Sequence, residues 1–129
     1  MFQSQIAFPV TFLIEADVAD ETYAVWKAPY AGEVIDLWAV VGATLTAGSG
    51  TGLAIVLQNG GQTGTATTAL GTVGSGTADD GWVADTVQAG SIGVATFVAG
   101  DVLCVKYDET GTYNPDWLSV GFNVRYGTS

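Results

Sequence analysis

The stretch Leu118-Ser119-Val120-Gly121-Phe122-Asn123-Val124-Arg125-Tyr126 decides the fold class of this chain. Every second residue from Leu118 to Tyr126 is apolar, and the residues between them are small or polar. Successive side chains of a β-strand point to opposite faces of its sheet, so this alternation predicts a strand with one buried face. A strand that is buried on one face only is typical of an antiparallel sheet.

Similar short apolar runs recur along the chain, and turn residues separate them. The chain contains 18 glycines spread over most of its length, which leaves few windows for a helix. Strands are expected at residues 10–15, 33–41, 53–57, 94–99 and 102–107, with weaker candidates at 23–28, 65–73 and 82–87. Residues 102–107 and 118–126 are expected to form a hairpin. The pattern predicts an all-β, antiparallel β-sandwich of eight or nine strands with a jelly-roll-like topology.

One domain and a short N-terminal arm are expected. The length of 129 residues and the hydrophobic share of 48% suit a single core. We therefore predict an arm at residues 1–9 and one β-sandwich domain at residues 10–129. The arm carries apolar, uncharged residues before Pro9, and these are expected to dock on a neighbouring copy of the chain or on a partner protein: Met1, Phe2, Ile6 and Phe8.

The charge of the chain excludes several classes of partner. Three basic residues stand against thirteen acidic ones, which gives a net charge of −10 and an isoelectric point near 4.1. Nucleic acid and anionic membrane surfaces are bound by clustered Lys and Arg, so neither is an expected partner. The sequence also lacks an apolar stretch of the ~20 residues that span a bilayer.

The residues needed for catalysis are largely missing. The chain has no His, the commonest general base and metal ligand at neutral pH. Cys104 lies within an apolar strand pattern and is expected to be a packed structural thiol. Asp79, Asp80 and Asp85 could offer oxygen ligands to calcium, but they lack the spacing of an EF-hand loop. We expect no enzyme activity and no cofactor.

Aromatic residues form the second group of candidates. Trp26 and Trp38 lie in apolar segments and are expected to pack in the core. Trp82, Tyr113 and Trp117 lie at predicted loop edges, where they could make surface contacts. With Asn114 they could also stack on and hydrogen-bond a sugar, so a lectin-like sandwich or fibre-tip module is the alternative function.

The expected strand at residues 33–41 is apolar on both faces. Ile35, Leu37, Ala39 and Val41 would point one way, and Val34, Trp38 and Val40 the other way with Asp36. Both faces would then need cover, and this favours an oligomer.

Two further stretches carry a resemblance to a known family. Lys27-Ala28-Pro29-Tyr30-Ala31-Gly32-Glu33-Val34-Ile35 precedes Phe97-Val98-Ala99-Gly100-Asp101-Val102-Leu103, and the terminal alternating strand follows. This order resembles the small jelly-roll cement or decoration proteins of tailed bacteriophage capsids, whose modules also occur in phage head and tail fibres. The resemblance covers roughly residues 27–129 and rests on permissive turns.

The resemblance implies a structural virion protein without enzyme activity. Such a protein is made in the host cytoplasm and binds the exterior of the capsid. Its implied partner is the major capsid protein, and its implied working form is a homotrimer that clamps neighbouring capsid subunits.

Overall fold

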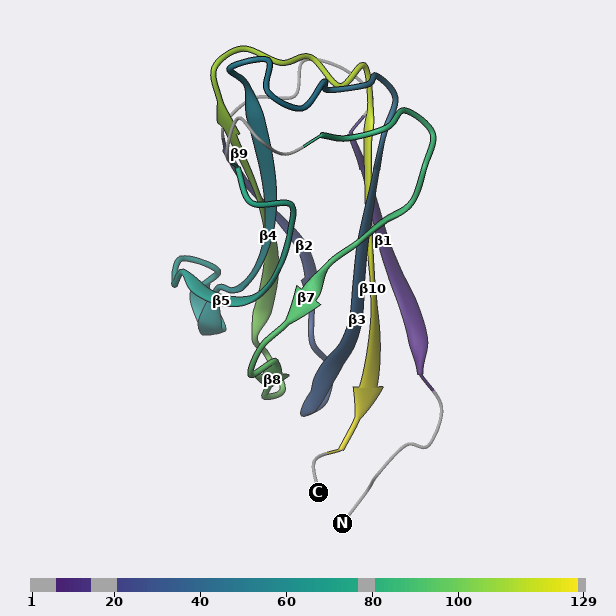
Figure 1. The fold of residues 1–129 in the computed structure, drawn as a ribbon. Helices are drawn as coiled ribbons and strands as arrows, with labels where there is room; N and C mark the ends of the chain where they lie inside the picture. Colours follow the sequence, from purple (N-terminus) through teal and green to yellow (C-terminus); the bar gives the residue numbers. More distant parts are fainter. Residues whose placement is uncertain (1–6, 15–20, 77–80, 128–129) are drawn as a thin grey trace.

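The computed structural model describes residues 7–14, 21–76 and 81–127. Two five-stranded antiparallel sheets pack face to face (Figure 1). The β3 sheet has the order β1 (Phe8–Ile14), β10 (Leu118–Tyr126), β3 (Gly32–Val41) and β6 (Gln88–Ala89), and β8 (Thr96–Phe97) also pairs with β3. The β4 sheet has the order β2 (Thr22–Lys27), β9 (Val102–Thr110), β4 (Gly52–Asn59), β5 (Thr68–Val73) and β7 (Ser91–Ile92).

The strand order confirms the predicted β-sandwich. β1 and β3 lie in one sheet, whereas β2 and β4 lie in the other. β9 then lies between β2 and β4, and β10 lies between β1 and β3. This winding is the jelly roll. The one helical element in the described part is the 3₁₀ turn η1 (Gly61–Thr63), and none of the described residues forms a helix that could span a bilayer.

The predicted hairpin of the last two long strands is wrong. β9 pairs with β2 and β4, whereas β10 pairs with β1 and β3 in the other sheet. The two strands therefore face each other across the core, and the loop at residues 111–117 crosses from one sheet to the other. The alternation of each strand fixes its buried face, but it carries no information on which neighbour completes its hydrogen bonds.

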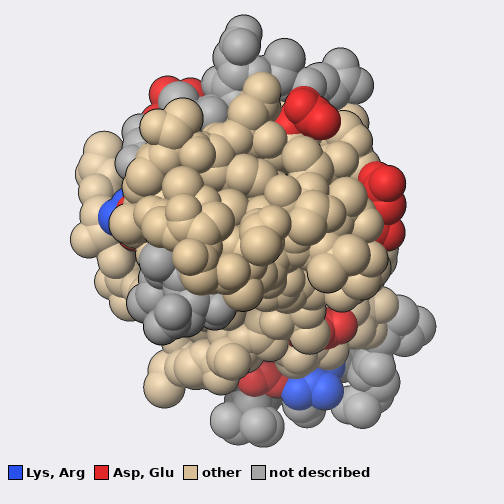
Figure 2. Space-filling model, turned by 45° about the horizontal axis from the view of Figure 1, so that its top comes forward, with Lys and Arg blue, Asp and Glu red and all other residues tan. Residues whose placement is uncertain are grey.

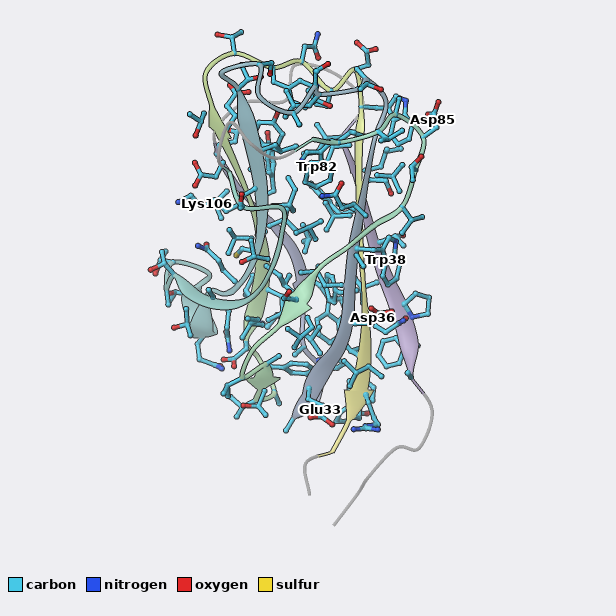
Figure 3. All side chains as sticks on the ribbon, in the orientation of Figure 1. Glu33, Asp36, Trp38, Trp82, Asp85 and Lys106 are labelled. Atoms are coloured by element: carbon cyan, nitrogen blue, oxygen red, sulfur yellow. The ribbon has the colours of Figure 1, made fainter. Side chains whose placement is uncertain are left out.

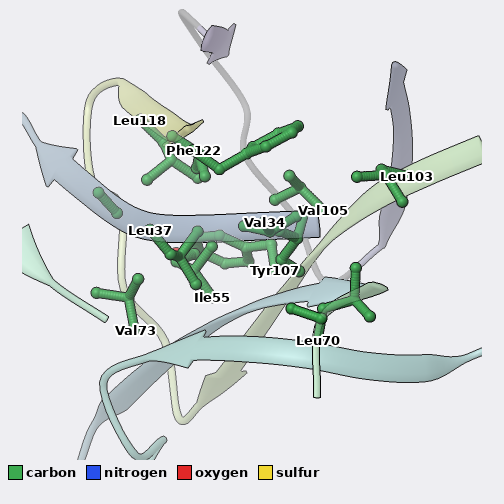
Figure 4. Close-up of a cluster of buried hydrophobic side chains, with 14 of the residues drawn as sticks. Val34, Leu37, Ile55, Leu70, Val73, Leu103, Val105, Tyr107, Leu118 and Phe122 are labelled. Atoms are coloured by element: carbon green, nitrogen blue, oxygen red, sulfur yellow. The ribbon is translucent and has the colours of Figure 1, made fainter. Parts of the chain in front are cut away.

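The core lies between these two strands and their neighbours (Figure 4). Leu118, Val120, Phe122 and Val124 of β10 are fully buried, as the alternation predicts, whereas Tyr126 at the strand end is only partly buried. From the opposite sheet, β9 contributes its own fully buried residues: Leu103, Val105 and Tyr107.

A β-bulge changes the predicted faces of β3. The register with β10 shifts between Asn123 and Val124, so that Asp36 pairs with Asn123 while Val34 pairs with Val124. One residue is thereby left unpaired, and the alternation reverses. Val34 joins Leu37, Ala39 and Val41 in the core, and Ile35 turns outward.

The connection between β5 and β9 has less strand than predicted. Only Thr96–Phe97 of the expected strand at residues 94–99 is extended into a sheet. The weak candidate at residues 82–87 is not a strand, and Trp82 makes an isolated bridge with Leu45. Residues 81–97 instead cross the open side of the sandwich, touching the β3 sheet through β6 and β8 and the β4 sheet through β7 (Figure 1).

Candidate functional site

The predicted arm is shorter than expected at its C-terminal end. Phe8 is the first residue of β1, and its ring lies 5.0 Å from that of Tyr126 and 6.4 Å from that of Trp26. Pro9 does not separate an arm from the strand, because β1 is an edge strand, where a missing N–H is tolerated. Phe8 is therefore a packing residue of the sandwich. Met1, Phe2 and Ile6 lie outside the described residues.

Trp82 is not a surface contact. Only 1% of the residue is exposed, and its indole N–H donates to the carbonyl of Leu53 at 3.3 Å. Figure 3 shows Trp82 between the two sheets. The neighbouring Asp79, Asp80 and Gly81 led to the prediction that Trp82 lies at a loop edge. The backbone bridge between Trp82 and Leu45 instead places the ring in the core.

Tyr113 and Trp117 lie together against the turn that follows β3. The Tyr113 hydroxyl donates to the carbonyl of Ala43. The indole of Trp117 covers Gly42 so closely that a Cβ at this glycine would be 2.3 Å from Nε1. Both side chains are half-buried, so each has one face on the protein and some exposed area.

The sugar-stacking arrangement is therefore incomplete. Trp82 is buried, and Asn114 Oδ1 accepts from the backbone N–H of Asp116 within its own turn. Tyr113 is held by Ala43, and burial together with the nearby Asp116 raises the pKa of its hydroxyl to about 12. These groups stabilise the loops at this end of the sandwich, and no observation of the structure favours a glycan site here.

Trp38 is on the outer face of the β3 sheet, contrary to the expectation that it packs in the core. A Cβ at Gly121 would lie 2.1 Å from the Trp38 ring, so the indole lies flat on the backbone of β10. Trp26 packs against the core as expected, with its ring 5.4 Å from that of Phe97 and 6.2 Å from that of Phe122.

Several of the described carboxylates have structural partners. Arg125 and Glu33 form a salt bridge between β10 and β3, and Asn123 donates to Asp36 at 3.3 Å. Among the described residues, no three acidic or thiol groups come together as a metal site would require. Asp85 lies in an exposed turn, whereas Asp79 and Asp80 fall outside the described residues.

Asp101 is the most constrained carboxylate of the described chain. It is 7% exposed and accepts hydrogen bonds from Val98 N–H, Asn59 Nδ2 and Gln62 Nε2 at 2.8–2.9 Å. Burial alone would raise its pKa, but the three hydrogen bonds together lower it. A carboxylate that stays ionised is a poor proton donor. The three hydrogen bonds of Asp101 instead hold the corner before β9 in place. The sequence marked this corner only by its Gly100-Asp101 turn.

Cys104 is buried under the loop that follows β4. Its thiol lies 3.7 Å from the carbonyl of Gly64, and burial raises the pKa of the thiol. A thiol with a raised pKa is a weak nucleophile at neutral pH. The expectation that Cys104 is a packed thiol is confirmed by its burial.

The surface itself is the remaining candidate for function. Several large apolar side chains are exposed, and four of them are valines of residues 81–100: Val83, Val87, Val94 and Val98. Figure 2 shows a broad area without charged side chains, with carboxylates at its margin. This arrangement can bind another protein surface.

Comparisons with known proteins bear on the fold of this chain and not on its surface. No protein-family model matches the chain, and no curated protein matches it in sequence. Among solved structures, it is similar to a chain of the acidic stable capsid structure of Helicobacter pylori bacteriophage KHP30. The TM-score is 0.55 at 11% identity, and the match covers 98% of this chain and 91% of the other. The similarity shows a shared fold.

Proposed function

We propose that this chain is a non-enzymatic structural protein of a phage virion that binds the exterior of the capsid. In this role it stabilises the lattice by clamping neighbouring subunits of the major capsid protein. The observation that carries the proposal is the similarity of nearly the whole chain to a chain of a phage capsid structure.

The charge distribution supports an exterior position. A chain with a net charge of −10 is repelled by packaged nucleic acid, and the described cations are few and scattered. Lys27 lies on β2, Lys106 on β9, and Arg125 is paired with Glu33. The same charge keeps the free protein soluble before it reaches the capsid.

The proposed working form is a homotrimer whose N-terminal residues Met1, Phe2 and Ile6 contact a neighbouring subunit. The start of β1 supports this role for the arm. Phe8 pairs with Val124 near the C-terminal end of β10, so β1 begins at one end of the sandwich. That end also carries the exposed Tyr30, whose ring is 5.2 Å from that of Tyr126.

Co-sedimentation with capsids tests the proposal directly. Capsids assembled from the major capsid protein of the same phage are mixed with the intact protein and with a variant that begins at Ala7. We expect the intact protein to sediment with the capsids and to raise their melting temperature. The variant that begins at Ala7 keeps all of β1 and should bind at least tenfold more weakly.

A matched control separates loss of the arm from loss of the fold. Replacing Phe2 and Ile6 by Ser keeps the length of the chain and removes only apolar contacts. This variant should match the truncated one in capsid binding and the intact protein in melting temperature. Absence of the intact protein from the capsid pellet at saturating concentration would overturn the proposed function, and equal binding by all three proteins would overturn the role of the arm.

A further inference from the structure

Two long stretches of the sequence carry no charge. No Asp, Glu, Lys or Arg occurs from residue 37 to residue 78, or from residue 86 to residue 100. The fold joins parts of the two stretches into one surface. β5 pairs with β7, Gly93 N–H donates to the carbonyl of Leu70 at 2.9 Å, and Gln62 donates to the carbonyl of Ala99 at 3.2 Å. We call the exposed surface of residues 60–73 and 86–100 the uncharged face.

The uncharged face is strongly apolar for a surface. Val94 is 84% exposed, Val87 is 64% exposed and Val98 is 57% exposed. Between them, residues 69–72 and 91–93 line a shallow groove along the junction of β5 and β7. Exposed apolar side chains around a groove are typical of a protein-binding surface.

Two carboxylates adjoin this surface in the chain: the exposed Asp85, before residue 86, and Asp101, which does not make the surface acidic. Asp101 follows residue 100 directly in the chain, but it is buried and accepts hydrogen bonds from Val98, Asn59 and Gln62. The described carboxylates that are exposed or half-exposed lie outside the uncharged face: Glu21 before β2, Glu33 and Asp36 on β3, Asp85 in its turn, Asp108 and Glu109 on β9, and Asp116 before β10.

The net charge indicates which partner this face suits. Two copies of the chain bring together twenty formal negative charges, ten from each, and like charges placed opposite each other disfavour binding. Copies therefore meet with the least repulsion where neither presents carboxylates. A basic partner would be drawn to the acidic parts of the molecule instead, and it would gain nothing electrostatically from the uncharged face.

We propose that the uncharged face is the surface through which copies of this chain contact one another. This inference rests on the homotrimer of the proposed function and assigns its interface. The valines at residues 87, 94 and 98 supply the apolar contact, and the groove between β5 and β7 receives side chains of the neighbouring copy. A stable interface of about 800 Å² for each partner is the usual requirement.

Light scattering during size exclusion tests this assignment. The protein is measured over a concentration series at low and high salt, beside the double variant Val87→Asp/Val94→Asp. The matched control Thr11→Asp/Thr112→Asp adds the same charge at two exposed positions outside the uncharged face. Circular dichroism reports the fold of each protein, and Val98→Asp replaces the double variant if that variant does not fold.

We expect the natural protein and the control to self-associate, and more strongly at high salt, because salt screens the repulsion between copies. The valine variant should stay monomeric at concentrations at least tenfold higher. A natural protein that is monomeric throughout, or a folded valine variant that associates as the natural protein does, would overturn the inference. Capsid co-sedimentation of the same proteins separates the two proposals, since a natural protein that is monomeric and still binds capsids overturns the homotrimer and its interface but leaves the capsid-binding role standing.

Discussion

The pair β3–β10 and the crossing segment at residues 81–97 are built on opposite principles. β3 and β10 are paired along almost their whole lengths, and β10 buries four consecutive inward residues completely. The crossing segment contains three strands of two residues each, and it exposes three large apolar side chains: Val83, Val87 and Val94. One region holds the sandwich together, whereas the other closes its open side and presents a surface.

Mutations in the β3–β10 pair are therefore expected to affect stability, and mutations of exposed valines in the crossing segment are expected to affect binding. A side chain between the sheets contacts both layers, so its loss leaves a cavity. A valine of the crossing segment already contacts water, so its loss costs little unless a partner covers it. Substitutions between the sheets should therefore lower the free energy of unfolding most, and substitutions of exposed valines should lower it least.

The largest effect is expected from Phe122→Ala. Phe122 is fully buried and packs with Trp26 across the sandwich, with the ring centres 6.2 Å apart. Its truncation should lower the free energy of unfolding by about 3–5 kcal/mol, as measured by urea denaturation. Val94→Ala is the control in the crossing segment, where the change should stay within about 0.5 kcal/mol. Similar losses at both positions would contradict the division.

The sequence predicted the strongly patterned region well. The alternation of β10 identified its buried stripe because that strand is antiparallel and solvated on one side. The pattern did not predict the β3 bulge, since the unpaired position of Ile35 is set by pairing with Asn123 and Val124, far away in the sequence. It also assigned β9 and β10 to one hairpin, because neighbours in sequence are paired more often than not.

The second effect concerns the outer face of the same strand pair. In Gly121→Ala, the new methyl group would meet the Trp38 ring at about the 2.1 Å found for its ideal position, so the indole must move. We expect a loss of about 1–3 kcal/mol, the usual range for overpacking, together with a red shift of the Trp fluorescence. The control is the same change in a Trp38→Ala background, where alanine should be neutral or stabilising because glycine weakens strands. An equal loss in both backgrounds would show that Trp38 is not the cause.

Asp101 tests the corner where the crossing segment ends. Asp101→Asn removes the charge from the acceptor of three hydrogen bonds and should cost about 1–2 kcal/mol at neutral pH. Because the pKa of Asp101 is lowered in the folded protein, its contribution is complete above the unfolded pKa of about 3.9 and is lost as the pH falls through the folded value. The measurement is the melting temperature of both proteins from pH 7 to pH 2. The difference between them should shrink below about pH 4, and a constant difference would contradict the role of the ionised form.

The candidate surface was harder to predict than the fold. The sequence offered aromatic residues as contacts, and Trp82 proved to be buried because Leu45, a distant residue, pairs with it. The signal for the uncharged face was present as the absence of charged residues, but the two stretches become one surface only when β5 pairs with β7. Strand patterns are local, whereas surfaces are assembled from segments that the topology brings together.

The smallest effect is expected at Tyr113, in the loop that carries the chain from β9 to β10 between the sheets. Tyr113→Phe removes the hydrogen bond to the Ala43 carbonyl and should cost about 0.5–1 kcal/mol at neutral pH, since the site is half-buried. The pKa of Tyr113 is raised to about 12 by burial and by Asp116, so its contribution is present below the unfolded pKa of about 10 and is lost as the pH rises through the folded value. Titration of the absorbance at 295 nm should show a tyrosine that ionises near pH 12 in the natural protein, and this step should be missing from the variant. An unchanged titration curve would show that the Tyr113 hydroxyl does not bond to the Ala43 carbonyl. The loop between β9 and β10 would then be positioned by the contact between Trp117 and Gly42 alone.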